Sequence, residues 1–200
     1  MATHLYLMRH GETLFNVQKR IQGWCDSPLT QKGIDQAKRA GRYMRKHSIK
    51  ADVYFASTTE RACDTLELAT GVSKYGRLKG LKEMSFGSFE GQQEYLHPPR
   101  DYRRKVGNYY EIHGGESDSQ VQERLKASIT QLAQDYDGQT ILAVSHAGAL
   151  MHFAHAVGID WESYQIFPTN CSIFEYSYDQ GQFKLLKLID PIQEIVHNFD

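Results

Sequence analysis

Two apolar segments of the chain each end abruptly in polar residues, and each predicts a buried strand. Residues 5–8 read Leu-Tyr-Leu-Met, and Arg9 and His10 follow directly, which predicts a strand over 3–9. Residues 140–145 read Thr-Ile-Leu-Ala-Val-Ser, and His146 follows this second predicted strand. Ligands of open α/β sheets bind beyond the carboxyl ends of the strands, so we expect both histidines to lie in one site.

The remaining periodicity predicts helices that alternate with strands. Apolar residues spaced three or four apart, such as Val121, Leu125 and Ile129, indicate amphipathic helices. We expect helices over 30–47, 59–69, 147–157 and from Ser117 onward, strands over 51–56 and 78–81, a loop over 11–29, and a hairpin of strands 172–178 and 183–189. This order predicts an α/β fold, a three-layer αβα sandwich around a mostly parallel central sheet.

The segment over residues 84–116 has weak periodicity and is rich in Gly, Tyr, Pro and charged residues. Long insertions of this kind in a compact domain often serve as lids, so we predict one domain over 1–200 with a lid-like insertion. Its aromatic and basic residues suit either a sugar or aromatic phosphate or simple packing of the lid: Tyr95, His97, Arg100, Tyr102, Arg103, Tyr109 and Tyr110.

Composition excludes several function classes. The net charge of −1 gives no global basic field, so we expect neither a nucleic-acid nor a membrane partner. The three cysteines lie far apart and form no Cys-x-x-Cys pair, which favours a reducing compartment over a disulfide framework. Without an apolar leader or a run of about 20 apolar residues, the cytoplasm is the expected location.

No metal or cofactor is expected either. The sequence contains no Gly-x-Gly-x-x-Gly, no phosphate-binding Gly-x-x-x-x-Gly-Lys loop and no His-Glu-x-x-His. His152 and His155 have a spacing on a predicted helix that could share a metal ion, but no third ligand of suitable spacing accompanies them.

Five ordered blocks of residues carry a family resemblance over nearly the whole chain. They are Arg-His-Gly-Glu-Thr at 9–13 with Asn16 and residues 22–33 after it, Arg61 at the start of a helix, Glu83 within 81–87, Gly-Gly-Glu-Ser at 114–117, and Val-Ser-His-Ala-Gly at 144–148. Together they resemble the histidine phosphatase superfamily, in its phosphoglycerate mutase-like branch.

The resemblance implies a role for each of these residues. His10 is expected to be the nucleophile that takes the phosphoryl group, and Glu83 the general acid and base. Arg9 and Arg61 are expected to hold phosphate oxygens with their planar guanidinium groups. His146 is expected to hydrogen-bond the transferring group, with a helix N-terminus beside it. Asn16, Gln22, Gly23 and Ala147 are the expected substrate-binding residues.

The residues after Glu83 favour hydrolysis over isomerisation. The mutase branch commonly continues with Arg-His-Tyr-Gly and carries a longer insertion, whereas Met84, Ser85 and Phe86 stand here and the insertion between Gly87 and Gly114 is shorter. We therefore expect hydrolysis of a small-molecule phosphomonoester, without a metal because phosphoryl transfer depends mainly on positioning and charge stabilisation.

Two alternatives remain open. A phosphoglycerate mutase is the first, since Arg103-Arg104 in the insertion could hold a substrate carboxylate. A non-catalytic regulator that binds a phosphorylated ligand is the second, and it is disfavoured because His10, Arg61, Glu83 and His146 are all present.

Overall fold

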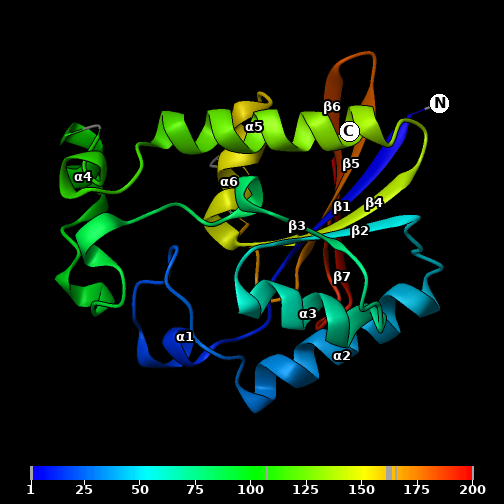
Figure 1. Ribbon diagram of the computed structural model, residues 1–200, viewed down its shortest axis with the longest axis horizontal. Helices are drawn as coiled ribbons and strands as arrows, with labels where there is room; N and C mark the ends of the chain where they lie inside the picture. The colour runs from blue at the N-terminus through cyan, green and yellow to red at the C-terminus, as the bar shows by residue number, and fades with distance from the viewer. Residues whose placement is uncertain (1, 107, 161–163, 165, 200) are drawn as a thin grey trace.

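A mixed sheet forms the centre of the computed structural model, which describes residues 2–106, 108–160, 164 and 166–199, with only the backbone of Arg100 and Arg104. Its strand order is β3-β2-β4-β1-β5-β6-β7 (Figure 1). The strands are β1 (Thr3–Arg9), β2 (Val53–Ser57), β3 (Gly76–Leu78), β4 (Thr140–Ser145), β5 (Ile173–Asp179), β6 (Gln182–Asp190) and β7 (Ile195–Asn198). Strands β3, β2, β4 and β1 run parallel, and β5, β6 and β7 extend the sheet in antiparallel fashion.

Helices cover both faces of this sheet, as the sequence predicts (Figure 1). They are α2 (Gln31–Lys46) and α3 (Glu60–Thr70) on one face, and α5 (Asp118–Asp135) and α6 (Ala147–Ala156) on the other. Alternate side chains of β1 point to opposite faces: Leu7 packs in one apolar cluster with Phe153 of α6, and Met8 in another with Leu66 of α3. The three-layer α/β sandwich is thereby confirmed. No helix in the described ranges is long and apolar enough to cross a membrane.

The register of the two central strands brings the predicted histidines together. Strands β1 and β4 are parallel neighbours, with Arg9 opposite Ser145. His10 and His146 therefore leave the same edge of the sheet side by side, and their ring centroids lie 5.2 Å apart. The expectation that both histidines occupy one site is confirmed.

Several predicted element boundaries are wrong. The predicted loop over 11–29 contains a short helix, α1 (Leu14–Gln18), which begins with a capping box between Thr13 and Asn16. Where a strand over 78–81 was predicted, β3 ends at Leu78 and a 3₁₀ turn over Lys79–Leu81 follows it. Strand β7 was not predicted, because its four residues lie at the sheet edge and do not show a buried alternation.

The segment over 84–116 is irregular and projects from one end of the molecule (Figure 1). It contains 3₁₀ turns over Gly87–Phe89, Glu94–Leu96 and Glu111–His113, and the helix α4 (Arg100–Val106). Rings from several of these turns contact one another, including Phe89 with His97 and Tyr110. Aromatic packing thus replaces regular secondary structure as the source of order in this segment.

Candidate active site

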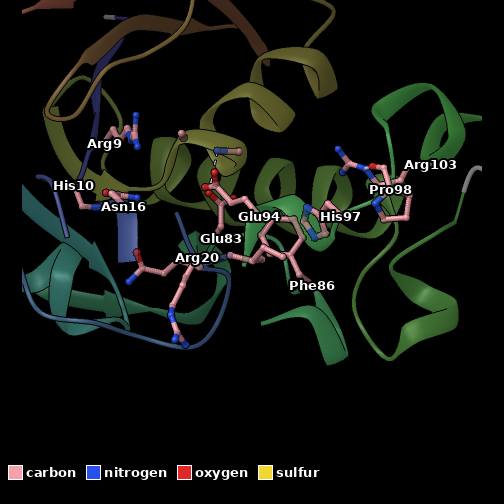
Figure 2. A pocket seen from close by; sticks show the side chains of 14 residues that line it. Arg9, His10, Asn16, Arg20, Glu83, Phe86, Glu94, His97, Pro98 and Arg103 are labelled. Carbon is pink, nitrogen blue, oxygen red and sulfur yellow. Dashed lines mark hydrogen bonds between the residues drawn. The ribbon is translucent and has the colours of Figure 1, made fainter. Parts of the chain in front are cut away.

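A cavity of about 520 Å³ lies at the carboxyl edge of the parallel strands. Arg9, His10 and Asn16 line one end of it, and His97, Pro98 and Arg103 of the irregular segment line the other (Figure 2). Glu83 is drawn between these two groups. The cavity therefore joins the predicted catalytic residues to the predicted lid.

His10 is held in a single orientation at the end of β1. Its Nδ1 lies 2.7 Å from the carbonyl oxygen of Gly11, which can only accept a hydrogen bond. Nδ1 therefore carries the proton, and the lone pair is on Nε2. Burial, followed by the positive charges of Arg61 and Arg9, holds the pKa of His10 well below its usual range. The imidazole is consequently neutral at pH 7, as a nucleophile must be.

His146 is locked into the opposite tautomer. Arg61 donates from Nη2 to His146 Nδ1 over 3.0 Å, so that Nδ1 must accept. His146 Nε2 then carries the proton and donates to Ser57 Oγ over 2.8 Å. Burial and the nearby guanidinium of Arg61 hold the pKa of His146 well below its usual range. Both ring nitrogens already have protein partners, so His146 here supports Arg61 and the ring of His10.

Arg61, at the start of α3, is fully buried and held by the loop that precedes α2. Its Nη1 donates to the carbonyl oxygen of Cys25 and to Asp26 Oδ1, and its Nη2 donates to the carbonyl oxygen of Gly23. Four acceptors, with His146 the fourth, fix the plane of the guanidinium.

Several N–H groups around His10 have no acceptor in the described part of the chain. They are the buried Nε of Arg9, the buried Nε of Arg61, and Nδ2 of Asn16, whose Oδ1 accepts from Thr13. Buried donors without partners cost free energy, and an anion beside His10 could supply the missing acceptors. The arrangement is thus suited to an oxyanion.

Glu83 reaches the cavity from a loop and is only 7% exposed. Its Oε2 accepts from the backbone N–H of Gly148 in the first turn of α6, and its Oε1 accepts from its neighbour Met84 (Figure 2). A Cβ at position 148 would lie 2.6 Å from Glu83 Oε1, so that only glycine allows this approach. The N-terminus of α6 was expected to face phosphate, and one of its N–H groups binds Glu83 instead.

The remaining predicted residues have different surroundings. Ala147 lines the cavity beside Gly148. Gln22 also lines it, but its amide already donates to Ser27 and accepts from Thr13. Gly23 is not among the described lining residues, and it contributes through the carbonyl group that holds Arg61. Asn16, by contrast, offers a free amide donor.

Four supporting residues were missed by the sequence analysis: Ser57, Asp26, Glu90 and Arg124. Arg124 of α5 donates to the carbonyl oxygens of Gly80, Lys82 and Glu83 and thereby holds the loop that carries Glu83. Bonds to backbone carbonyls leave no spacing pattern in a sequence, which explains why this role was not predicted. Among the described residues, no group of three or more His, Cys, Asp or Glu is arranged to hold a metal ion.

Two facing histidines, one fully buried and one partly buried arginine, and a glutamate at this sheet edge are the arrangement expected of a phosphoryl-transfer site of the histidine phosphatase kind. The sequence profile of the histidine phosphatase superfamily (branch 1) matches residues 5–191, and the chain belongs to this superfamily of enzymes.

Similar proteins carry several different names. The chain is 32% identical over 190 residues to the probable phosphoglycerate mutase GpmB of Salmonella typhi, covering 90% of this chain and 86% of that protein. The crystal structure of phosphoglycerate mutase from Bacillus anthracis superposes with a TM-score of 0.79 at 25% identity, covering 92% of this chain and 91% of that one. Phosphoserine phosphatase from Entamoeba histolytica shares the fold with a TM-score of 0.82 at 23% identity, over 96% and 100% of the two chains.

Proposed function

We propose that this enzyme hydrolyses phosphomonoesters through a phosphohistidine formed on His10. The observation that carries the proposal is the tautomer of His10, whose Nδ1 proton is held by the Gly11 carbonyl while the Nε2 lone pair is left for phosphorus. The lowered pKa of His10 keeps that lone pair free of a proton across the neutral pH range. Arg9, Arg61 and Asn16 would bind the phosphoryl oxygens.

In the first step, Nε2 of His10 attacks phosphorus and the ester P–O bond breaks. A proton held on the Glu83 carboxyl group passes to the leaving alcohol oxygen. In the second step, water attacks the phosphoryl group, its proton returns to Glu83, and the N–P bond breaks to release inorganic phosphate. Arg9 and Arg61 would stabilise the negative charge in both steps, with His146 holding Arg61 in place.

The side chains after Glu83 support hydrolysis over isomerisation. Met84 is 4% exposed and is not among the described lining residues, and Phe86 presents an apolar ring to the cavity. Neither can hold the charged groups of a phosphoglycerate. Phosphoglycerate mutase remains the second candidate, and the name of the Salmonella relative favours it.

The proposal is tested by turnover of p-nitrophenyl phosphate. We expect His10→Ala to lower kcat by at least about 10³-fold, because the proposed covalent intermediate forms on the ring that this change removes. His155→Ala, which removes an exposed histidine of α6, is the matched control and should retain wild-type turnover. Equal turnover by the wild-type enzyme and His10→Ala would exclude both enzyme candidates and favour a phospho-ligand-binding regulator.

Incubation with 3-phosphoglycerate distinguishes the two enzymes. Phosphorus NMR should record release of inorganic phosphate as the substrate disappears. Accumulation of 2-phosphoglycerate without free phosphate would instead identify a mutase.

A further inference from the structure

The turn formed by residues 168–172, between α6 and β5, contacts the catalytic end of the cavity without lining it. None of its residues is among the described lining residues of the cavity. Its hydrogen bonds nevertheless reach Arg9, His10 and Asn16, which are labelled together at one end of the cavity (Figure 2). The turn therefore lies where it can set the positions of the groups proposed to attack and hold phosphate.

The backbone of this turn holds Arg9 and His10. The carbonyl oxygen of Pro168 accepts from Arg9 Nη1 over 2.8 Å, and that of Ser172 accepts from the Arg9 backbone N–H over 2.9 Å. The backbone N–H of Cys171 donates to the His10 carbonyl oxygen over 3.4 Å. Any residue supplies such backbone groups, so these contacts depend on the path of the chain and not on the identity of a side chain.

The side-chain amide of Asn170 makes the contacts that do depend on residue type. Its Nδ2 donates to the His10 carbonyl oxygen over 3.1 Å and to Asn16 Oδ1 over 3.5 Å. Asn16 Oδ1 also accepts from the backbone N–H of Thr13 over 3.1 Å. Two donors therefore hold the oxygen end of the Asn16 amide, and the Nδ2 end, which only donates, is left for a phosphoryl oxygen. Asn170 thus joins the backbone of the nucleophile to the orientation of a phosphate-binding amide.

The conformation of the turn is strained at Cys171, which has a φ of 65°. This left-handed region is uncommon for residues other than glycine, asparagine and aspartate, and it persists only where the surrounding structure enforces it. The Cys171 side chain is fully buried in the apolar cluster that contains Met8, and its burial opposes the strain. Thr169 holds the turn from another side by donating to Asp190 Oδ2 over 2.8 Å. These contacts keep Asn170 in a fixed place.

We propose that Asn170 is a positioning residue for phosphoryl transfer, which fixes the amide of Asn16 relative to the backbone of His10. The inference rests on the proposed function for the roles of His10 and Asn16. Asn170 acts through these two residues and not by touching the phosphate. The orientation of the Asn16 amide is decisive, because an amide turned by 180° would present its oxygen to the phosphoryl oxygens and repel them.

Two substitutions of Asn170 test this role by steady-state turnover of p-nitrophenyl phosphate. Asn170→Ala removes the donor, and we expect kcat to fall about tenfold. Asn170→Asp has nearly the same shape but places a carboxylate beside two oxygens, which favours an Asn16 amide with Nδ2 turned toward it. We expect kcat to fall about a hundredfold. Asn198→Ala, which removes an exposed asparagine of β7, is the control and should retain wild-type kcat.

A double-mutant cycle shows whether Asn170 acts through Asn16. In the Asn16→Ala background the amide that Asn170 orients is gone, so Asn170→Ala should lower kcat by about threefold or less instead of about tenfold. Urea unfolding of each variant gives the folded fraction, so that kcat refers to folded enzyme. The proposal would be overturned by effects that simply multiply, by wild-type kcat in Asn170→Ala, or by a smaller loss in Asn170→Asp than in Asn170→Ala.

Phosphate binding separates this inference from the proposed function. Calorimetric titration with inorganic phosphate measures the oxyanion site without turnover, and Asn170→Asp should raise the Kd by about tenfold or more. That result supports the positioning role even if the wild-type enzyme does not hydrolyse p-nitrophenyl phosphate. Turnover that depends on His10, together with wild-type kcat and Kd in Asn170→Asp, would refute the positioning role alone. A wild-type chain that neither binds phosphate nor hydrolyses the ester would refute both.

Discussion

At the residue scale, Glu90 connects the two halves of the catalytic machinery. Its Oε1 accepts from the backbone N–H groups of Trp24 and Phe86, and its Oε2 accepts from that of Cys25. The carbonyl of Cys25 holds Arg61, and the indole Nε1 of Trp24 donates to the carbonyl of Glu83. One carboxylate thus sets the position of the phosphate-binding arginine relative to the acid.

Replacing Glu90 tests this connection. Glutamine keeps an oxygen for Trp24 and Phe86 but turns an amide nitrogen toward the N–H of Cys25. We expect Glu90→Gln to lower kcat about tenfold and Glu90→Ala about a hundredfold, because displacements of about 1 Å have effects of that order. Steady-state kinetics with p-nitrophenyl phosphate checks this. A variant that loses stability but keeps wild-type kcat would assign Glu90 to folding alone.

At the element scale, the first turn of α6 meets the loop that carries Glu83. The contact depends on the missing side chain of Gly148, whose N–H donates to Glu83 Oε2 over 2.9 Å. Arg124 of α5 donates to the backbone carbonyl of Glu83 and holds the loop, so the Glu83 carboxylate can move little away from Gly148. The first turn of α6, the loop and the Glu83 carboxylate are therefore held in fixed positions relative to one another.

Gly148→Ala should separate catalysis from stability. The new Cβ would lie 2.6 Å from Glu83 Oε1 and force the carboxylate away, so we expect kcat to fall about 10- to 100-fold. Alanine is the better helix former, by about 0.5–1 kcal/mol, which offsets part of the steric cost. Kinetics and urea unfolding on the same preparation check both effects. Unchanged kcat would argue against Glu83 as the proton donor.

The same elements explain what the sequence could and could not predict. Strands β1 and β4 were predicted because both faces of each are covered, and His10 and His146 then followed from their carboxyl ends. The groups that hold the Arg61 guanidinium were not predicted, because two of them are backbone carbonyls, which any residue supplies. Helix α1 was missed because it buries no residue and so has no apolar periodicity.

At the scale of the whole molecule, the fold buries histidine side chains in their uncharged form. His10 is 5% exposed and His146 is fully buried, and both have a pKa well below 6.5. His97, at the other end of the cavity, has its pKa lowered to about 4. Each accepts a proton more readily in the unfolded chain than in the folded one, so acid favours unfolding.

The free energy of unfolding should therefore be greatest above pH 6.5 and should fall as the pH drops below that value. Below pH 6.5, His10 and His146 each approach a slope of about 1.4 kcal/mol per pH unit, and the contribution of His97 has the same sign and ends as it titrates near pH 4. Urea unfolding between pH 7.5 and 5 measures the total. His10→Asn, which cannot take up a proton, should show a slope shallower by about 1.4 kcal/mol per unit, whereas replacing the exposed His155 with Asn should not. A stability that stays constant from pH 7.5 to 5 would mean that His10 and His146 take up protons as readily in the folded enzyme as in the unfolded chain. The pKa of His10 would then not be lowered, and a proton would occupy the attacking lone pair below about pH 6.5.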